Sequence, residues 1–203
     1  MRWGSLVFMT ITVVALPPAY AEVDKGLVQC AAAENPISRL ACFDRLASDR
    51  GASANTSPST PPGAGKWQTN TKTDPLTDKA VYTAAVFADT AEGKFGKPIG
   101  LFVRCKDNRT EMYVTWNSYL GRDEAMVTYR IDKEPAKASR WGLSTDNTAT
   151  FFPGSPVPTL KKLANSSSFV ANLTPYNDNP ITAVFDMTGA DKALADIRKG
   201  CNW

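Results

Sequence analysis

The chain has 203 residues, with 23 Lys and Arg against 20 Asp and Glu, so its formal net charge is +3. This mild balance excludes the strongly basic surface typical of nucleic-acid-binding proteins, and we predict no nucleic-acid partner. The sequence contains no histidine, which excludes Ser-His and Cys-His dyads, His-ligated zinc and histidine proton shuttles.

Residues 1–21 have the features of a secretory signal peptide. Arg2 supplies the positive start, and an apolar run follows over residues 3–16. That run is shorter than the about 20 residues needed to cross a bilayer. The triplet at 19–21 has the small-x-small pattern of a cleavage site, so we predict export with cleavage after Ala21. The alternative is an N-terminal membrane anchor; no later stretch reaches transmembrane length, so no integral membrane segment is expected after cleavage.

The four cysteines, Cys30, Cys42, Cys105 and Cys201, all follow the predicted cleavage site. An even number of cysteines in an exported chain predicts two disulfides. Three pairings are possible, and we favour Cys30–Cys42 and Cys105–Cys201. A four-cysteine metal site is the alternative, but no C-x-x-C pair is present to form one. We therefore expect no metal and no cofactor.

Residues 22–49 are predicted to form a small disulfide-linked helical hairpin. Asn35 followed by Pro36 is typical of an N-cap and the first position of a helix. On one continuous helix Cys30 and Cys42 would be about 18 Å apart, at 1.5 Å per residue. A disulfide needs Cα atoms within about 7 Å, so the chain must fold back between them if they pair.

Residues 50–66 are rich in Ser, Pro and Gly and predict a flexible linker. The alternative is a long surface loop packed on the neighbouring domain.

Residues 67–203 are predicted to form a β-rich domain. Short runs of β-branched, aromatic and aliphatic residues follow one another, separated by turn signals. The expected strands are 80–88, 99–104, 112–116, 125–131, 140–143, 148–152, 169–173 and 181–187. Short helices are expected near 160–163 and at 190–199. Strands without regular intervening helices favour an antiparallel sandwich or a barrel-like fold with a C-terminal helix.

Candidate catalytic chemistry is sparse. Glycosidases need two carboxylates about 5 to 9.5 Å apart, and the carboxylates here are scattered. Asp123 with Glu124, and Asp186 with Asp191, are close only in sequence. No phosphate-binding loop, no dinucleotide fingerprint and no S-x-x-K in the β-rich domain is present. We predict that the protein is not an enzyme and has no catalytic residues.

The aromatic residues of the β-rich domain allow two interpretations, a core or a binding patch. Strand alternation places Trp116 and Trp141 in the core. Arg130 points to the other face of its predicted strand from Tyr129, and it is the best exposed candidate for a contact with a partner. Because Tyr and Arg are enriched at interaction hot spots, we take Arg130, Arg104 and Tyr119 as the candidate interaction surface.

Several short segments, each present once, follow one another in a characteristic order along the chain. Cys30 is followed by Arg39-Leu40-Ala41-Cys42-Phe43-Asp44. The later segments are Leu101-Phe102-Val103-Arg104-Cys105, Glu111-Met112-Tyr113-Val114-Thr115-Trp116, Tyr119-Leu120-Gly121, Val127-Thr128-Tyr129-Arg130-Ile131-Asp132, Trp141-Gly142-Leu143-Ser144-Thr145-Asp146, Pro175-Tyr176, Ala183-Val184-Phe185-Asp186 and Cys201-Asn202-Trp203. This ordered set resembles the VasI/TagO family of type VI secretion-associated proteins, over nearly all of the chain after residue 21 except the linker.

The resemblance implies a periplasmic accessory protein of a type VI secretion system. The family has no settled activity, so no functional residue is carried over from it. The expected partner is another envelope protein, such as a secretion-system component. The alternative function is a periplasmic inhibitor, or a peptidoglycan-associated factor, that acts on a cell-wall hydrolase. A hydrolase using two carboxylates is a third hypothesis.

Overall fold

The computed structural model describes residues 25–33, 35–49 and 58–203. The chain divides into two compact units, residues 1–54 and residues 55–203, and each is described by itself. The predicted signal peptide at 1–21 and residues 50–57 of the predicted linker lie outside the described residues. None of the described helices is long and apolar enough to span a membrane.

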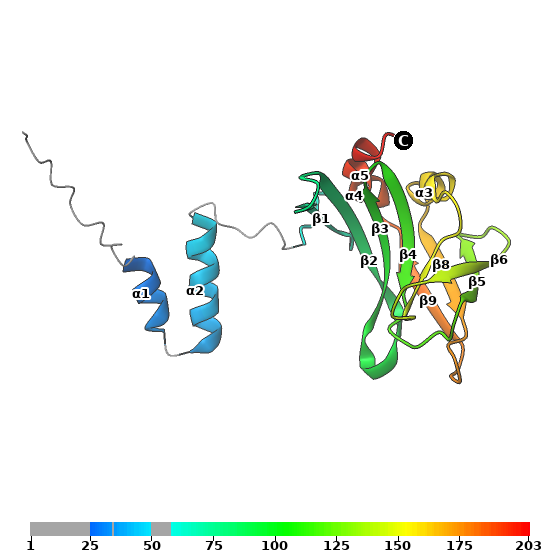
Figure 1. Ribbon diagram of the computed structural model, residues 1–203, viewed down its shortest axis with the longest axis horizontal. Coiled ribbons are helices and arrows are strands. Elements are labelled where there is room, and N and C mark those ends of the chain that lie inside the picture. Colours follow the sequence, from blue (N-terminus) through cyan, green and yellow to red (C-terminus); the bar gives the residue numbers. More distant parts are fainter. Residues whose placement is uncertain (1–24, 34, 50–57) are drawn as a thin grey trace, which may run out of the picture. The chain divides into compact units, whose positions relative to one another are not determined.

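The first unit is a helical hairpin of α1 (Lys25–Ala31) and α2 (Pro36–Asp49) (Figure 1). The Oδ1 of Asn35 accepts a hydrogen bond from the backbone N–H of Ser38 at 3.3 Å, which is the contact of an N-cap side chain. Cys30 and Cys42 form a disulfide with their Cα atoms 5.3 Å apart. The predicted hairpin and its cross-link are therefore present.

Nine strands of the second unit form one antiparallel sheet in the order β1-β2-β3-β4-β7-β6-β5-β8-β9. The strands are β1 (Gln68–Thr73), β2 (Ala80–Glu92), β3 (Pro98–Lys106), β4 (Arg109–Thr115), β5 (Glu124–Ile131), β6 (Lys137–Leu143), β7 (Ala149–Phe151), β8 (Ser168–Leu173) and β9 (Ile181–Asp186). The helical elements are η1 (Lys94–Gly96), α3 (Val157–Leu163), α4 (Ala190–Ala193) and α5 (Ala195–Gly200). The expected mainly β antiparallel fold, with a C-terminal helix and an N-terminal hairpin, is confirmed.

The sheet curves so that β9 comes close to β2, although the two strands are not neighbours in the hydrogen-bonded order (Figure 1). The Nζ of Lys66 lies 2.8 Å from Asp89 on β2 and 3.6 Å from Asp186 on β9. The side chain thus bridges two strands that share no backbone ladder. This curvature gives the sheet an inner face, which holds the core, and an opposite outer face.

The core between the inner face and the helices contains three fully buried tryptophans, Trp67, Trp116 and Trp141. The Trp116 indole N–H donates to the hydroxyl of the buried Thr150 at 2.9 Å, and the Trp141 indole N–H donates to Ser139 at 3.0 Å. Buried indoles usually find such partners, because an unpaired N–H in an apolar core is costly. The core positions predicted for Trp116 and Trp141 are confirmed.

The predicted C-terminal helix is present as two short helices, α4 and α5, which are separated at Leu194. Leu194 and Ile197 are buried. Gly200 is the last residue of α5 and lies close to β2, because a Cβ there would be 2.4 Å from the Tyr82 ring. This close approach brings Cys201 to Cys105 on β3, with Cα atoms 5.9 Å apart in the second favoured disulfide.

Two stretches differ from the sequence-based expectation. Residues 58–66, which were assigned to the linker, pack on the sheet: Ala64 is fully buried, and Ser59 forms a β-bridge with Thr69. These contacts place residues 58–66 in the same unit as the sheet. Strand β1 was not predicted, because its sequence has no large apolar residue and so no hydrophobic period.

Candidate functional site

Strand alternation determines which side chains lie on the outer face. On β3, Ile99, Leu101 and Val103 are buried in the core, while Phe102 and Arg104 point to the opposite side and are only half-buried. Successive side chains of a strand point to opposite faces, and cross-strand register passes this assignment to the neighbouring strands.

A row of three aromatic rings crosses the outer face on adjacent strands. Phe102 on β3 is directly opposite Tyr113 on β4, and Tyr113 is directly opposite Phe151 on β7. The ring centroids are 5.2 Å apart in the first pair and 5.0 Å apart in the second. Phe87 on β2 meets Phe102 edge to face at 6.0 Å. We call Phe102, Tyr113 and Phe151 the aromatic row.

Two glycines leave room beside the aromatic row. A Cβ on Gly100 would lie 2.5 Å from the Phe102 ring, so only glycine lets that ring lie over the β3 backbone. Gly142 on β6 is opposite Phe151, and a Cβ there would meet nothing within 4 Å. The row is therefore packed at its β3 end and open at its β6 end.

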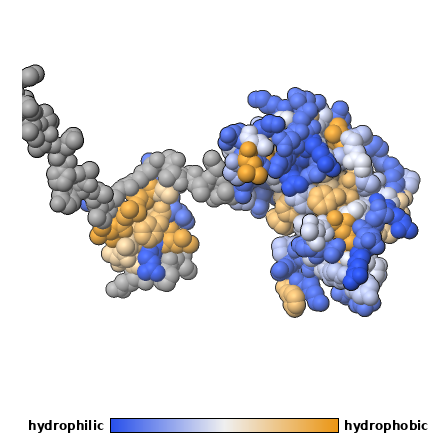
Figure 2. Space-filling model, viewed as in Figure 1, coloured by the Kyte–Doolittle hydropathy of each residue, from blue (hydrophilic) through white to orange (hydrophobic). Residues whose placement is uncertain are grey.

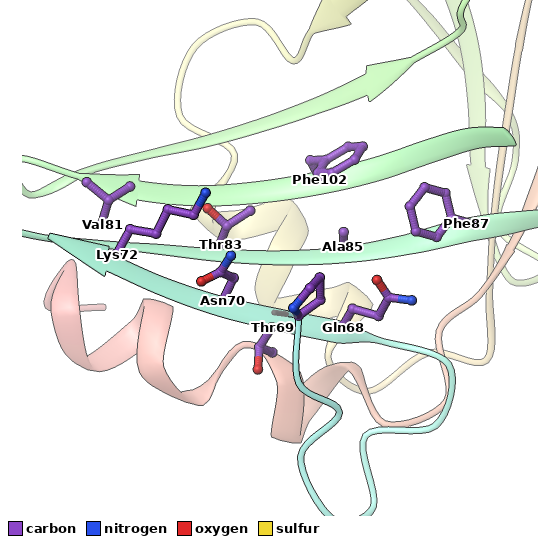
Figure 3. Close-up of a pocket in the computed structure, with 10 residues that line it drawn as sticks. Gln68, Thr69, Asn70, Lys72, Val81, Thr83, Ala85, Phe87 and Phe102 are labelled. Atoms are coloured by element: carbon purple, nitrogen blue, oxygen red, sulfur yellow. The ribbon is translucent and has the colours of Figure 1, made fainter. Parts of the chain in front are cut away.

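A groove of about 300 Å³ lies beside the aromatic row, over β1, β2 and β3 (Figure 3). Its floor is mostly apolar, and one rim is formed by side chains of β1. The lining residues are Pro58, Gln68, Thr69, Asn70, Lys72, Val81, Thr83, Ala85, Phe87 and Phe102. Its volume is at the lower end of the range for ligand pockets.

Charged side chains continue the outer face beyond the row. The Arg104 guanidinium donates to the Glu111 carboxylate on β4, and its centre lies 5.9 Å from the centroid of the Tyr113 ring. Burial raises the pKa of the Tyr113 phenol above its ordinary value, so this side chain stays neutral at physiological pH. Lys72, on the groove rim, makes no ion pair within residues 58–203.

The residues predicted as an interaction surface do not lie together. Arg104 is on β3 and Arg130 is on β5, four strands away in the sheet order, or about 19 Å at about 4.8 Å per strand. Both point outward, but Arg104 is paired with Glu111 and Arg130 is exposed. Tyr119 lies in the β4–β5 loop and packs edge to face on Tyr176, with ring centroids 5.8 Å apart. Only Arg104 borders the aromatic row.

A separate exposed aromatic side chain lies at the tip of the β2–β3 hairpin. Phe95 is 89% exposed and has a φ of 61°, in the left-handed region that a bulky residue rarely adopts. The base of the tip is held in place: the Lys94 N–H donates to the Asn117 carbonyl at 3.0 Å, and the Asn117 side-chain amide donates to the Pro98 carbonyl at 2.7 Å. Figure 1 shows this loop at the end of the sheet opposite α4 and α5.

Asp186 and Asp191, two carboxylates that are close in sequence, both make structural contacts. Hydrogen bonds from Thr188, assisted by Lys66, lower the pKa of Asp186, which is the opposite of what a general acid needs. Asp191 pairs with Arg198 at 2.8 Å. Within residues 25–33, 35–49 and 58–203, no group of three or more potential ligands is arranged to hold a metal ion.

Sequence reasoning did not find the aromatic row or the groove. The alternation of residues 112–116 put Tyr113 on one face of the strand and Trp116 on the other. This was the available signal that the Tyr113 ring points outward. Assembling the row also required that β4 pairs with β7 rather than with β5, its successor in sequence. The groove required β1.

Comparisons with known proteins agree with this architecture. A model of the family described as "Type VI secretion system VasI, EvfG, VC_A0118" matches residues 29–203. The crystal structure of invasion associated protein B from Bartonella henselae is similar, with a TM-score of 0.50 and 11% sequence identity, over 71% of this chain and 97% of that one. At this identity the similarity concerns the fold alone. A search of curated proteins gave no match.

Proposed function

The chain belongs to the VasI family of type VI secretion proteins, and on this premise we propose that it is a non-catalytic accessory protein of the periplasm that binds another envelope protein. The two disulfides are consistent with folding in an oxidising compartment. The signal peptide expected at residues 1–21 would bring it there. A test of this step is the intact mass of the chain recovered from the cell envelope, which we expect to begin at Glu22.

The aromatic row is the observation that carries the binding function. Phe102, Tyr113 and Phe151 are only half-buried, although they are large and lie side by side. Burying the remaining surface of such rings contributes about 25 cal/mol per Å². Aromatic side chains next to an arginine, here Arg104, have the composition of an interaction hot spot. The row is preorganised by its strands, so little conformational entropy is lost on binding.

The experiment is a crosslinking pull-down from intact cells with two outer-face variants, Tyr113→Lys and Phe151→Glu. We expect each variant to recover at least about tenfold less of a type VI envelope component, because a charge would be forced into an apolar contact. Met126→Glu is the matched control, since Met126 is an exposed apolar residue of β5 on the same face. All three variants should melt as the unchanged protein does. Equal recovery from all of them would exclude the row as the binding surface.

A second candidate, inhibition of a cell-wall hydrolase, is supported by the β2–β3 tip. A rigidly held, 89% exposed Phe95 on a protruding hairpin is suited to insertion into an enzyme cleft. We expect such an inhibitor to slow the clearing of a cell-wall suspension by a muramidase, and Phe95→Ser to abolish the effect. Inhibition that persists in Phe95→Ser, or none from the unchanged protein, would remove this candidate.

A further inference from the structure

We propose that the groove over β1, β2 and β3 binds an extended peptide segment of the partner protein, with an apolar side chain followed two residues later by an acidic one. This inference rests on the proposed function, because it names the chemistry of the partner at the same face. It requires an apolar subsite, a cationic subsite and a spacing between them that suits a strand-like peptide.

The apolar subsite is at the Phe87 end of the groove. Ala85 and Phe102 are directly opposite each other on β2 and β3, and Phe87 stands beside them with its ring edge to face against Phe102. Figure 3 shows the two rings flanking the small Ala85 side chain. A methyl group between two rings leaves a hollow that a Leu, Ile or Phe side chain would fill.

The cationic subsite is the ammonium group of Lys72. This side chain lines the groove and has no ion-pair partner within residues 58–203. Lys106, on the same face of β3 two strands away, is instead paired with Asp74 at 2.6 Å. Figure 3 shows the Lys72 side chain running back over the groove towards Thr83. A carboxylate on the ligand would supply the missing partner.

The spacing of the two subsites matches an extended chain. Ala85 is opposite Gln68, Thr83 is opposite Asn70 and Val81 is opposite Lys72, so the Lys72 backbone is two outward positions from Ala85. Its side chain runs back to Thr83 (Figure 3), which is one outward position from the apolar subsite. Outward positions of a strand are about 6.8 Å apart, which is also the separation of side chains i and i+2 of an extended peptide. Apolar-x-acidic is therefore the pattern that places both groups at once.

Ring orientation favours a peptide over a glycan. Sugars stack on the faces of aromatic rings, but the rings of Phe102 and Tyr113 are within 5° of parallel and cover each other's faces. They present edges and a narrow apolar surface to the outside. The floor is formed mainly by the apolar Val81, Ala85 and Phe87, with Thr83 as the polar side chain between them.

The test is an NMR titration of the protein with a defined peptide of sequence Gly-Ser-Leu-Thr-Asp-Ser-Gly. We expect shifts in the backbone amides of Lys72, Thr83 and Phe102. Replacing the peptide Leu by Ser should weaken binding about tenfold, since an apolar side chain loses its burial. Replacing the peptide Asp by Lys should weaken it about threefold or more, as for loss of a partly exposed ion pair.

A charge swap tests the pairing itself. Lys72→Glu should reverse the preference, so that it binds the peptide with Lys in place of Asp more tightly than the original. Lys97→Glu is the control, because Lys97 is an exposed lysine of the β2–β3 loop outside the groove. Ala85→Leu should fill the apolar subsite and abolish binding of both peptides, with an unchanged circular dichroism spectrum showing that the sheet is intact.

The outcomes separate this inference from the proposed function. If no peptide of this pattern shifts the groove amides while Tyr113→Lys still loses the partner, the ligand chemistry is wrong and the binding function stands. If N-acetylglucosamine oligomers shift those amides and the peptides do not, the occupant is a glycan. An unchanged preference in Lys72→Glu would overturn the cationic subsite.

Discussion

The helical hairpin of residues 25–49 and the sheet of residues 58–203 each contain one disulfide. The two units differ in how many apolar side chains are buried around that bond. Among the hairpin side chains that the structure describes, only Cys30 is buried, and Leu27, Val28 and Leu40 are 45 to 63% exposed. Figure 2 shows hydrophobic residues over much of the hairpin surface. The sheet encloses three fully buried tryptophans, and its disulfide is added to an extensive core.

The difference shows that the same covalent bond has two roles in one chain. A unit this small buries too little apolar surface to offset the conformational entropy lost on folding, so the cross-link has to hold it. In the sheet domain, the bond between Cys105 and Cys201 attaches α5 to β3 and supplements the burial of Leu194 and Ile197. The two units should therefore respond differently to core substitutions and to reduction.

The largest effect is expected from Trp116→Ala. Removing a fully buried indole leaves a cavity and an unpaired Thr150 hydroxyl, at a cost of about 3–5 kcal/mol in the free energy of unfolding of the sheet. Urea unfolding followed by fluorescence measures it. Leu76→Ala, at a 92% exposed position, should change that free energy by less than about 0.5 kcal/mol. A loss below 1 kcal/mol for Trp116→Ala would contradict the core described here.

The double variant Cys30→Ser, Cys42→Ser should unfold the hairpin and leave the sheet intact. Closing this short loop is worth about 3 kcal/mol, which exceeds what a hairpin with a single described buried side chain can supply otherwise. The measurement is the loss of helical circular dichroism with an unchanged thermal transition of the sheet. Cys105→Ser with Cys201→Ser should instead lower the melting temperature of a sheet that still folds. Retention of the hairpin helices without their disulfide would show that the cross-link is not needed to fold the hairpin.

A smaller and opposite effect is expected from Phe95→Gly. The left-handed backbone at Phe95 is strained for a bulky residue, and glycine adopts it freely, so the sheet should gain about 0.5–1 kcal/mol after the entropy of the unfolded chain is included. Phe95→Ala separates the two contributions, since it removes the ring but keeps the strain. Equal stability of Phe95→Gly and Phe95→Ala would show that the backbone strain is not significant.

The smallest effect is a pH dependence at Asp146. The Ser144 hydroxyl, with that of Thr148, lowers the pKa of the Asp146 carboxyl below its ordinary value near 3.8. A lowered folded-state pKa contributes stability above the unfolded pKa, and this is lost as pH falls through the folded pKa. Unfolding free energies between pH 5 and about pH 2 should therefore fall less steeply in Asp146→Asn, by under about 1 kcal/mol because the site is exposed. Parallel curves would contradict the hydrogen-bonded turn.

Local rules predicted much of this protein because its strands carry their own signals. The alternation of Met112, Val114 and Trp116 determined both a strand and its buried face, and the Asn35-Pro36 pair located the start of α2. Strand β1 could not be predicted from the sequence, because its six residues are held by pairing with β2 rather than by burial of large side chains. The packing of residues 58–66 on the sheet could not be predicted for the same reason, since Ser59 is held by a backbone bridge to Thr69.

The candidate site was much less predictable than the fold. Arg104, Tyr119 and Arg130 were chosen one at a time from local sequence, and the structure separates them into three places. The aromatic row needs three residues that are 11 and 38 positions apart in sequence, Phe102, Tyr113 and Phe151, to meet on one rung of the sheet. No periodicity within a strand carries that information.

The sequence by itself indicated the short-range Cys30–Cys42 cross-link, the strand-rich composition and the inward tryptophans, because each depends on residues within one hairpin or one strand. The tertiary structure alone decided that β4 pairs with β7, that β9 lies against β2 and that β1 forms the rim of a groove. Those outcomes depend on which distant strands bury their faces together. The free energy that stabilises these strand pairings comes from packing across the whole sheet, so no single segment of the sequence determines them.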